Sequence, residues 1–227
     1  MLFVESPFTE NATKLFNDIE TKDIKNIYIV LNIVITKHKE TDKLKITLNI
    51  RTFVWIMFYI EDKNFISEEQ GRHLDDLLKF DLPWYFSPDA YPGDDAQFLY
   101  HIVIRRPEAR TDKLFNSPTG PFFMKLFNQF TERYDIKYDE IYRCCINLTF
   151  PLPFLPTQHE DHTFPYNHFV IYLNDSDGDT CIYNKKGTEI EKRVTPEKHK
   201  GVCFEKRLHY AEFPTNGLRF AAVYTFK

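Results

Sequence analysis

The stretch HFVIYLNDSDGDTCIYN, residues 168–184, predicts the fold of the C-terminal half of the chain. Two short apolar runs, residues 168–174 and 180–184, flank a polar turn that contains Gly178, as strands flank a turn. Similar runs, separated by turns, occupy residues 140–150, 157–163, 188–194, 201–204 and 218–226. Several short strands at this spacing predict a sandwich or a barrel.

Upstream of this half, the pattern is mixed. Residues 26–36 are rich in β-branched and aromatic residues, and residues 43–52 alternate strictly between apolar and polar side chains, so both predict strands. Residues 9–20 have the spacing of a helix. The apolar residues 53–60 show no alternation and predict a fully buried strand.

Two further helices are predicted to flank the strands. A capping box at residues 67–70 opens one of them, and a second amphipathic helix begins near Pro121. Prolines make residues 81–97 a loop. We therefore expect a mainly β fold with flanking helices (α+β), in which a helix and strand segment, residues 1–97, packs on a core, residues 98–227, as one continuous unit.

Composition limits the class of protein. The chain has 227 residues, of which 43% are hydrophobic and 27% charged, as in an ordinary globular protein. The net charge is −4 and neither half carries a basic stripe, which disfavours a nucleic-acid partner. The longest apolar run is shorter than the roughly 18 residues of a membrane span, and the N-terminus lacks a signal-peptide pattern. The four cysteines form no C-x-x-C pair, and we expect a cytoplasmic location.

The tripeptide H-x-D occurs twice, and its setting separates the two copies. His73 and Asp75 lie in the predicted capped helix, where residues i and i+2 point in different directions, so we interpret His73 as a surface residue. His159 and Asp161 lie in a predicted strand, where they share a face. This second pair supplies two adjacent positions for a metal ion.

A third ligand has four candidates: His162, His168, His199 and His209. His162 faces away from His159 on the predicted strand. Only six residues separate His168 from Asp161, which leaves little chain to return across a metal ion. His199 lies between two lysines in a loop and is typical of an exposed turn.

His209 is the strongest candidate because a buried cation is predicted near it in the sequence. It ends a strand-like run, and ten residues later Arg219 lies in an apolar C-terminal strand. A guanidinium is costly to bury there unless an anion meets it. Two histidines and one aspartate leave three positions open on a metal, which suits non-haem Fe(II) that also binds a co-substrate and O₂. A buried arginine offers a fork for a dicarboxylate such as 2-oxoglutarate.

A family resemblance rests on these residues taken in order: His159-Glu-Asp161, residues 168–175, residues 177–180, residues 202–204, His209-Tyr210 and Gly217-Leu-Arg219. Together they resemble the Fe(II)/2-oxoglutarate-dependent oxygenases. The order is similar to that of the prolyl-4-hydroxylase branch and of compact oxygenases encoded by phages. The resemblance covers residues 141–227 well and residues 80–133 loosely.

The resemblance implies a double-stranded β-helix, which is a jelly-roll (cupin-like) core of two facing sheets with iron at its mouth. Three residues would hold the Fe(II): His159, Asp161 and His209. Arg219 would pair with the distal carboxylate of 2-oxoglutarate, with Thr180 and Asn147 as further contacts to it. Tyr172 would face either this site or the opposite sheet.

The implied activity is that of a dioxygenase, which couples oxidation of a substrate by O₂ to decarboxylation of 2-oxoglutarate to succinate and CO₂. The substrate would be a protein side chain, proline being one option, or a small polar molecule. Arg219 departs from the lysine that prolyl hydroxylases commonly carry. Two alternatives are a jelly-roll that binds metal or ligand without turnover and a nucleic-acid dealkylase. Thr225 disfavours the dealkylase, because that branch has a second arginine at this position.

Overall fold

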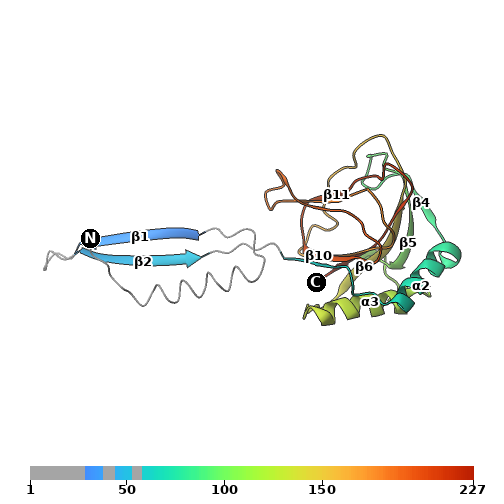
Figure 1. Ribbon diagram of the computed structural model, residues 1–227, viewed down its shortest axis with the longest axis horizontal. Coiled ribbons are helices and arrows are strands. Elements are labelled where there is room, and N and C mark those ends of the chain that lie inside the picture. The colour runs from blue at the N-terminus through green and yellow to red at the C-terminus, as the bar shows by residue number, and fades with distance from the viewer. Residues whose placement is uncertain (1–28, 38–43, 53–57) are drawn as a thin grey trace. The chain divides into compact units, whose positions relative to one another are not determined.

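The computed structural model describes residues 29–37, 44–52 and 58–227. The chain divides into two compact units, Met1–Met57 and Phe58–Lys227. In the first unit, β1 (Ile29–Lys37) and β2 (Leu44–Thr52) form an antiparallel pair (Figure 1), which confirms the two strands predicted there. The predicted helix at residues 9–20 lies outside the described residues. The expected division at residues 97 and 98 stays a prediction.

Two antiparallel sheets build the second unit. The larger sheet has the strand order β3-β10-β7-β12-β6-β5-β4, and the smaller one has the order β11-β8-β9. The larger sheet consists of β3 (Tyr59–Asp62), β4 (Tyr85–Ser87), β5 (Phe98–Ile104), β6 (Ile141–Thr149), β7 (Asn167–Tyr172), β10 (Gly201–Glu205) and β12 (Arg219–Phe226). The smaller sheet consists of β8 (Thr180–Tyr183), β9 (Ile190–Val194) and β11 (His209–Ala211). From β7 onward the chain passes back and forth between the two sheets, which is the jelly-roll arrangement. The predicted fold class is confirmed.

The two α-helices of residues 58–227 lie on the same side of the larger sheet (Figure 1). Helix α2 (Glu68–Asp76) begins at the predicted capping box, in which Ser67 and Gln70 exchange side-chain and backbone hydrogen bonds, and it continues into a π-helical turn, Leu77–Asp81. Helix α3 (Gly120–Arg133) begins with Pro121 in its first turn. No helix in the described part of the chain is long and apolar enough to cross a bilayer.

The main core lies between α3 and the larger sheet. Phe123, Phe127 and Phe130 of α3 repeat at helical spacing and are fully buried, and the rings of Phe127 and Phe130 meet those of β7 and β12. Phe130 lies 4.2 Å from Phe169 and Phe127 lies 5.3 Å from Tyr224, measured between ring centroids. Burial of each such ring stabilises the fold by about 2–3 kcal/mol. Alternation along β7 and β12 sends the intervening side chains to the opposite face of the sheet.

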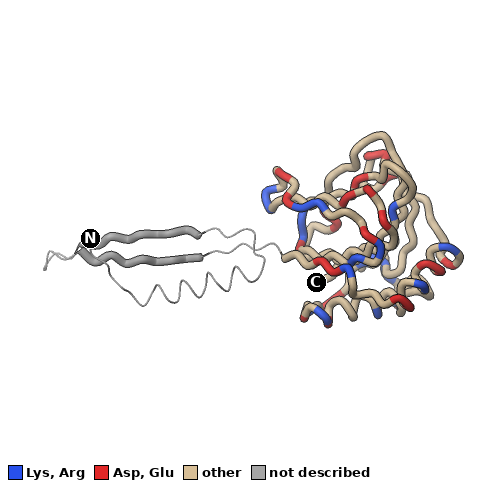
Figure 2. The backbone as a smooth tube through the Cα atoms, in the orientation of Figure 1, with Lys and Arg blue, Asp and Glu red and all other residues tan. Residues whose placement is uncertain are grey.

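Three local predictions are wrong. Residues 157–163 form no strand, because only His159 among them pairs with a neighbouring strand, in an isolated bridge with His209. His209 begins β11 and does not end a strand-like run. Of the strand predicted at residues 53–60, the structure describes only residues 58–60, and the part of it that lies in β3, Tyr59 and Ile60, is half-buried and not fully buried as predicted. Acidic and basic residues are interspersed along residues 58–227 (Figure 2).

Candidate metal and co-substrate site

A cavity of about 380 Å³ lies between the two sheets of the second unit. Its walls come from β6, β7, β10 and β12 on one side and from β8 and β11 on the other. All six residues singled out from the sequence line it: Asn147, His159, Asp161, Thr180, His209 and Arg219. Residues more than 70 positions apart in the sequence therefore meet in one space.

At one end of the cavity, imidazoles and a carboxylate gather closely enough to hold a metal ion. Ligand atoms of Asp161, His168 and His209 all lie within 4.8 Å of one another. Oδ2 of Asp161 is 2.9 Å from Nε2 of His168 and 3.9 Å from Nε2 of His209. The ring of His159 is 4.9 Å from that of His209, and the two residues exchange both backbone hydrogen bonds across their bridge. Four residues are therefore candidate ligands of a metal ion here: His159, Asp161, His168 and His209.

The second ring nitrogen distinguishes these histidines. Nδ1 of His159 lies 2.9 Å from the carbonyl of Thr157, and Nδ1 of His209 lies 2.9 Å from the carbonyl of Arg207. A carbonyl only accepts, so each Nδ1 carries the proton and each Nε2 offers a lone pair. Hydrogen-bonded in this way, an imidazole has the orientation and tautomer of a metal ligand. Burial and the nearby His168 also lower the pKa of His209 to about 3, which keeps its ring neutral.

His168 has the opposite arrangement. Its Nε2 faces the ionised carboxylate of Asp161 and must therefore donate to it, and its buried Nδ1 has no hydrogen-bond partner in the described part of the chain. The ring is fully buried and stacks on Phe204 at 4.5 Å. The expectation that six intervening residues are too few is wrong, because the turns between residue 161 and β7 reverse the chain. We interpret His168 as a hydrogen-bonding neighbour of Asp161.

Asp161 is held from both of its oxygens. Oδ2 accepts from His168, while Oδ1 lies 3.4 Å from Nη1 of Arg143 and 3.5 Å from Nη2 of Arg106. Its backbone N–H donates to the hydroxyl of Tyr166. Burial alone would raise the pKa of this carboxyl, but the hydrogen bond from His168 and the charge of Arg143 outweigh it and hold the pKa well below its usual value. Asp161 is therefore an anion when a metal ion arrives.

At the other end of the cavity, Arg219 is held by neutral oxygens. Its Nε donates to the carbonyl of Gly178 and its Nη2 to Oγ1 of Thr180, both at 2.9 Å. Tyr172 donates to the same Oγ1 at 2.7 Å, so Tyr172 faces this site. Arg219 is 4% exposed and forms no ion pair with a carboxylate of the described residues. Burial lowers the pKa of the guanidinium, because removing its positive charge from water costs free energy.

Two features near Arg219 were not found from the sequence. Gly178 is required because a Cβ there would lie 2.5 Å from the carbonyl of Glu212 and 3.2 Å from Cδ of Arg219. Thr149 pairs with Arg219 between β6 and β12, and its buried Oγ1 has no partner among the described residues. Oδ1 of Asn147 is unpaired in the same way. Strand alternation places Asn147 and Thr149 on one face, which was the available signal.

The remaining candidate histidines lie outside the cavity. His73 is exposed on α2, as predicted, and its ring contacts that of Phe122. His162 is 2.8 Å from Oγ1 of Thr225, and its ring stacks on Phe164. His199 is half-buried and packs over Gly71 of α2, so it is not the exposed turn residue that was expected.

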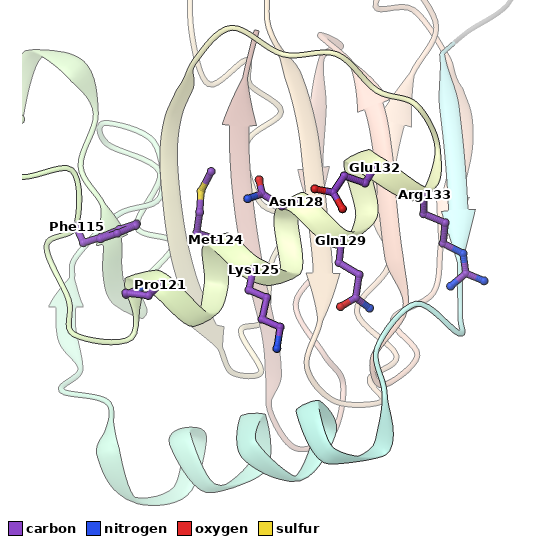
Figure 3. Close-up of a pocket in the computed structure, with 8 residues that line it drawn as sticks. All are labelled: Phe115, Pro121, Met124, Lys125, Asn128, Gln129, Glu132 and Arg133. Carbon is purple, nitrogen blue, oxygen red and sulfur yellow. The ribbon is translucent and has the colours of Figure 1, made fainter.

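A second hollow lies on α3, away from this cavity (Figure 3). Its lining side chains include Met124 and Lys125 and come mainly from the outer surface of the helix. Gln129 donates to the carbonyl of Phe65, and Arg133 pairs with Asp62. These polar groups are already bonded, so we assign this hollow no chemistry.

Comparison with known proteins places the chain by its fold. No family model matches the sequence, and no curated protein matches it. Among solved structures, an oxidoreductase of the 2OG-Fe(II) oxygenase family from Burkholderia pseudomallei matches with a TM-score of 0.61 and 16% identity, over 74% of this chain and 84% of that one. A prolyl-4-hydroxylase from Pseudomonas putida matches at 0.49 and 14%, over 74% and 92% of the two chains. HygX from Streptomyces hygroscopicus, with nickel and 2-oxoglutarate bound, matches at 0.46 and 11%, over 75% and 82%. The chain therefore has the fold of the 2-oxoglutarate–Fe(II) oxygenases.

Proposed function

We propose that this protein is an Fe(II)- and 2-oxoglutarate-dependent dioxygenase. The observation that carries the proposal is the pairing, within one cavity, of a histidine and aspartate cluster with a buried arginine that has no carboxylate partner among the described residues. The fold shared with the Burkholderia oxygenase supports the same conclusion.

The donor set fits a ferrous ion. His159, Asp161 and His209 would hold it, because both histidines have Nδ1 bonded to a carbonyl, which leaves Nε2 as the atom to meet the metal. Two histidines and one carboxylate leave three positions for the co-substrate and O₂. When bound, the iron would supply the O₂ chemistry that oxidises the substrate while 2-oxoglutarate is converted to succinate and CO₂.

The chain's own residues bind and orient the co-substrate. Arg219 would take the distal carboxylate of 2-oxoglutarate through its guanidinium fork, and Thr180 would add a hydroxyl. Asn147, whose amide Oδ1 has no partner among the described residues, would add a further contact by donating its side-chain N–H to the co-substrate. Val170, Phe204 and Val223 line the same cavity and limit the access of water to it.

The primary reaction would be hydroxylation of a protein side chain, proline included, or of a small polar molecule. A cytoplasmic location and likeness to phage-encoded enzymes remain predictions from the sequence.

Anaerobic titration of 2-oxoglutarate into the Fe(II) protein tests the proposal. The charge-transfer absorbance reports binding at the metal, and we expect Arg219→Ala to weaken 2-oxoglutarate binding at least 30-fold while Fe(II) affinity stays unchanged, since losing one partner of a buried charge pair costs about 2–5 kcal/mol. The matched control is Arg110→Ala, which removes an arginine that is paired with Glu140 outside the cavity. Equal affinity in wild type and Arg219→Ala would contradict the assignment. Iron and 2-oxoglutarate binding without any succinate formation would favour a silent binding module.

A further inference from the structure

The metal end of the cavity contains two arginines that neither the metal nor the co-substrate requires. Arg143 projects from β6, and Arg106 follows the end of β5. Both line the cavity, and both approach the same oxygen, Oδ1 of Asp161. Two guanidiniums therefore converge on a single carboxylate.

Asp161 does not satisfy this pair. The contacts to Oδ1 are long, at 3.4 and 3.5 Å, whereas charge-assisted bonds of this kind usually measure about 2.7–2.9 Å. Arg106 makes its short bond, 2.8 Å, to the backbone carbonyl of residue 161. Arg143 has no carboxylate partner other than Asp161 within the described residues. A divalent ion bound to Asp161 would share the single negative charge of that carboxylate. The charges of the two guanidiniums would then not be balanced.

This pair is separate from the co-substrate end. On β12, Arg219 pairs with Thr149 of β6, and Thr225 pairs with Arg143 of the same strand. Arg219 and Arg143 therefore lie six strand residues apart, a Cα separation of about 20 Å. In the proposed function, Arg219 and the metal take the two ends of 2-oxoglutarate, which leaves the guanidiniums beside Asp161 for a second anion.

We propose that Arg143 and Arg106 bind an anionic group, a carboxylate or a phosphate, on the primary substrate. Planar guanidiniums match both groups through two parallel hydrogen bonds. Their place beside Asp161 would hold the rest of the substrate near the metal. The identification of this anion as part of the substrate rests on the proposed function, but the binding of the anion does not.

The test uses the full chain loaded with Ni(II) and saturated with 2-oxoglutarate, titrated calorimetrically with acetate and, separately, with inorganic phosphate. We expect one of the two anions to bind, and its affinity to fall at least tenfold in Arg143→Gln and in Arg106→Gln. Arg143→Lys keeps the charge beside Asp161 and loses the fork, so it should give an intermediate loss. Arg110→Gln is the matched control and should bind as wild type. The stronger of the two anions identifies carboxylate or phosphate as the substrate group.

Three results would overturn the proposal. One is that Arg143→Gln binds each anion with the same affinity as wild type. Another is a loss confined to Arg219→Gln, which would place the anion at the co-substrate end. A third is a change in the Ni(II) absorption that persists in every variant, which would place the anion on the metal itself. Arg106 has a side chain that is 36% exposed, so Arg106→Gln should fold even if Arg143→Gln does not. Failure of wild type to take up 2-oxoglutarate would overturn the proposed function and leave the anion site testable.

Discussion

The two ends of the cavity handle positive charge differently. At the co-substrate end, one guanidinium is almost completely buried and is held only by a carbonyl and a hydroxyl. At the metal end, two more exposed guanidiniums and an imidazole surround one carboxylate. At the first end, Arg219 has no carboxylate partner among the described residues, and in the proposed function the co-substrate supplies one. At the second end, Asp161 is the anion, and two guanidinium charges share its one negative charge.

The metal end shows a second contrast, between its histidines. His159 and His209 have their Nδ1 atoms bonded to carbonyls two residues earlier, whereas Nδ1 of His168 has no partner within the described residues. Proximity alone would make His168 as good a ligand as His209. Hydrogen bonding to the far side of each ring is therefore the reason for proposing His159 and His209, and not His168, as ligands.

The largest expected effect is the loss of metal from the metal end. Asp161→Ala, His159→Ala and His209→Ala should each abolish Fe(II) binding, measured by equilibrium dialysis, with His73→Ala as the unaffected control. Asp161→Ala should also lower the free energy of unfolding by about 3–5 kcal/mol, because it leaves Arg143 and His168 without their anion. A variant of His159 that retains full Fe(II) affinity would transfer its role to His168.

The next effect concerns the co-substrate end. Arg219→Lys keeps a positive charge but loses the fork that bonds Gly178 and Thr180. We expect 2-oxoglutarate to bind about 10-fold more weakly, less severely than in Arg219→Ala, with Fe(II) affinity unchanged. If Arg219→Lys weakened iron and 2-oxoglutarate equally, the two ends would not be independent.

Substitutions of His168 test whether this residue is a metal ligand or only a hydrogen-bonding neighbour of Asp161. His168→Leu should weaken metal binding about 10–100-fold by freeing the Asp161 carboxylate, and His168→Gln, whose amide can still donate, should restore part of it. Electron paramagnetic resonance of the Cu(II) protein should count two nitrogen ligands in wild type and in His168→Leu. Three nitrogens in wild type and two in the variant would make His168 a ligand.

The smallest effect is expected at Thr149. Thr149→Val is nearly isosteric and removes a buried hydroxyl that has no partner among the described residues. The free energy of unfolding should change by less than about 1 kcal/mol, while 2-oxoglutarate affinity should fall by a few-fold if the hydroxyl meets the carboxylate. Chemical denaturation and the anaerobic titration measure the two quantities. An unchanged 2-oxoglutarate affinity would remove Thr149 from the co-substrate end.

Local patterns in the sequence predicted much of this architecture. Alternation located the strands, the capping box located the start of α2, and the order of His159, Asp161, His209 and Arg219 pointed to side chains that share one cavity. Spacing along the chain could not reveal Arg106 and Arg143, or the contact of His168 with Asp161, because these partners are set by turns and strand register. The strand expected at residues 157–163 is absent for the same reason, because only His159 meets a pairing partner, in its bridge with His209.

In the proposed site, the isolated bridge between His159 and His209 would couple metal binding to local opening of residues 157–163. It is where residues 157–163 pair with the sheet that carries β11, and two backbone hydrogen bonds form it. Local opening of such a small unit costs little free energy. A metal ion held by both side chains would act as a cross-link and suppress that opening in proportion to its occupancy. The amide exchange rates of His159 and His209 would then serve as a direct gauge of how fully the site is loaded.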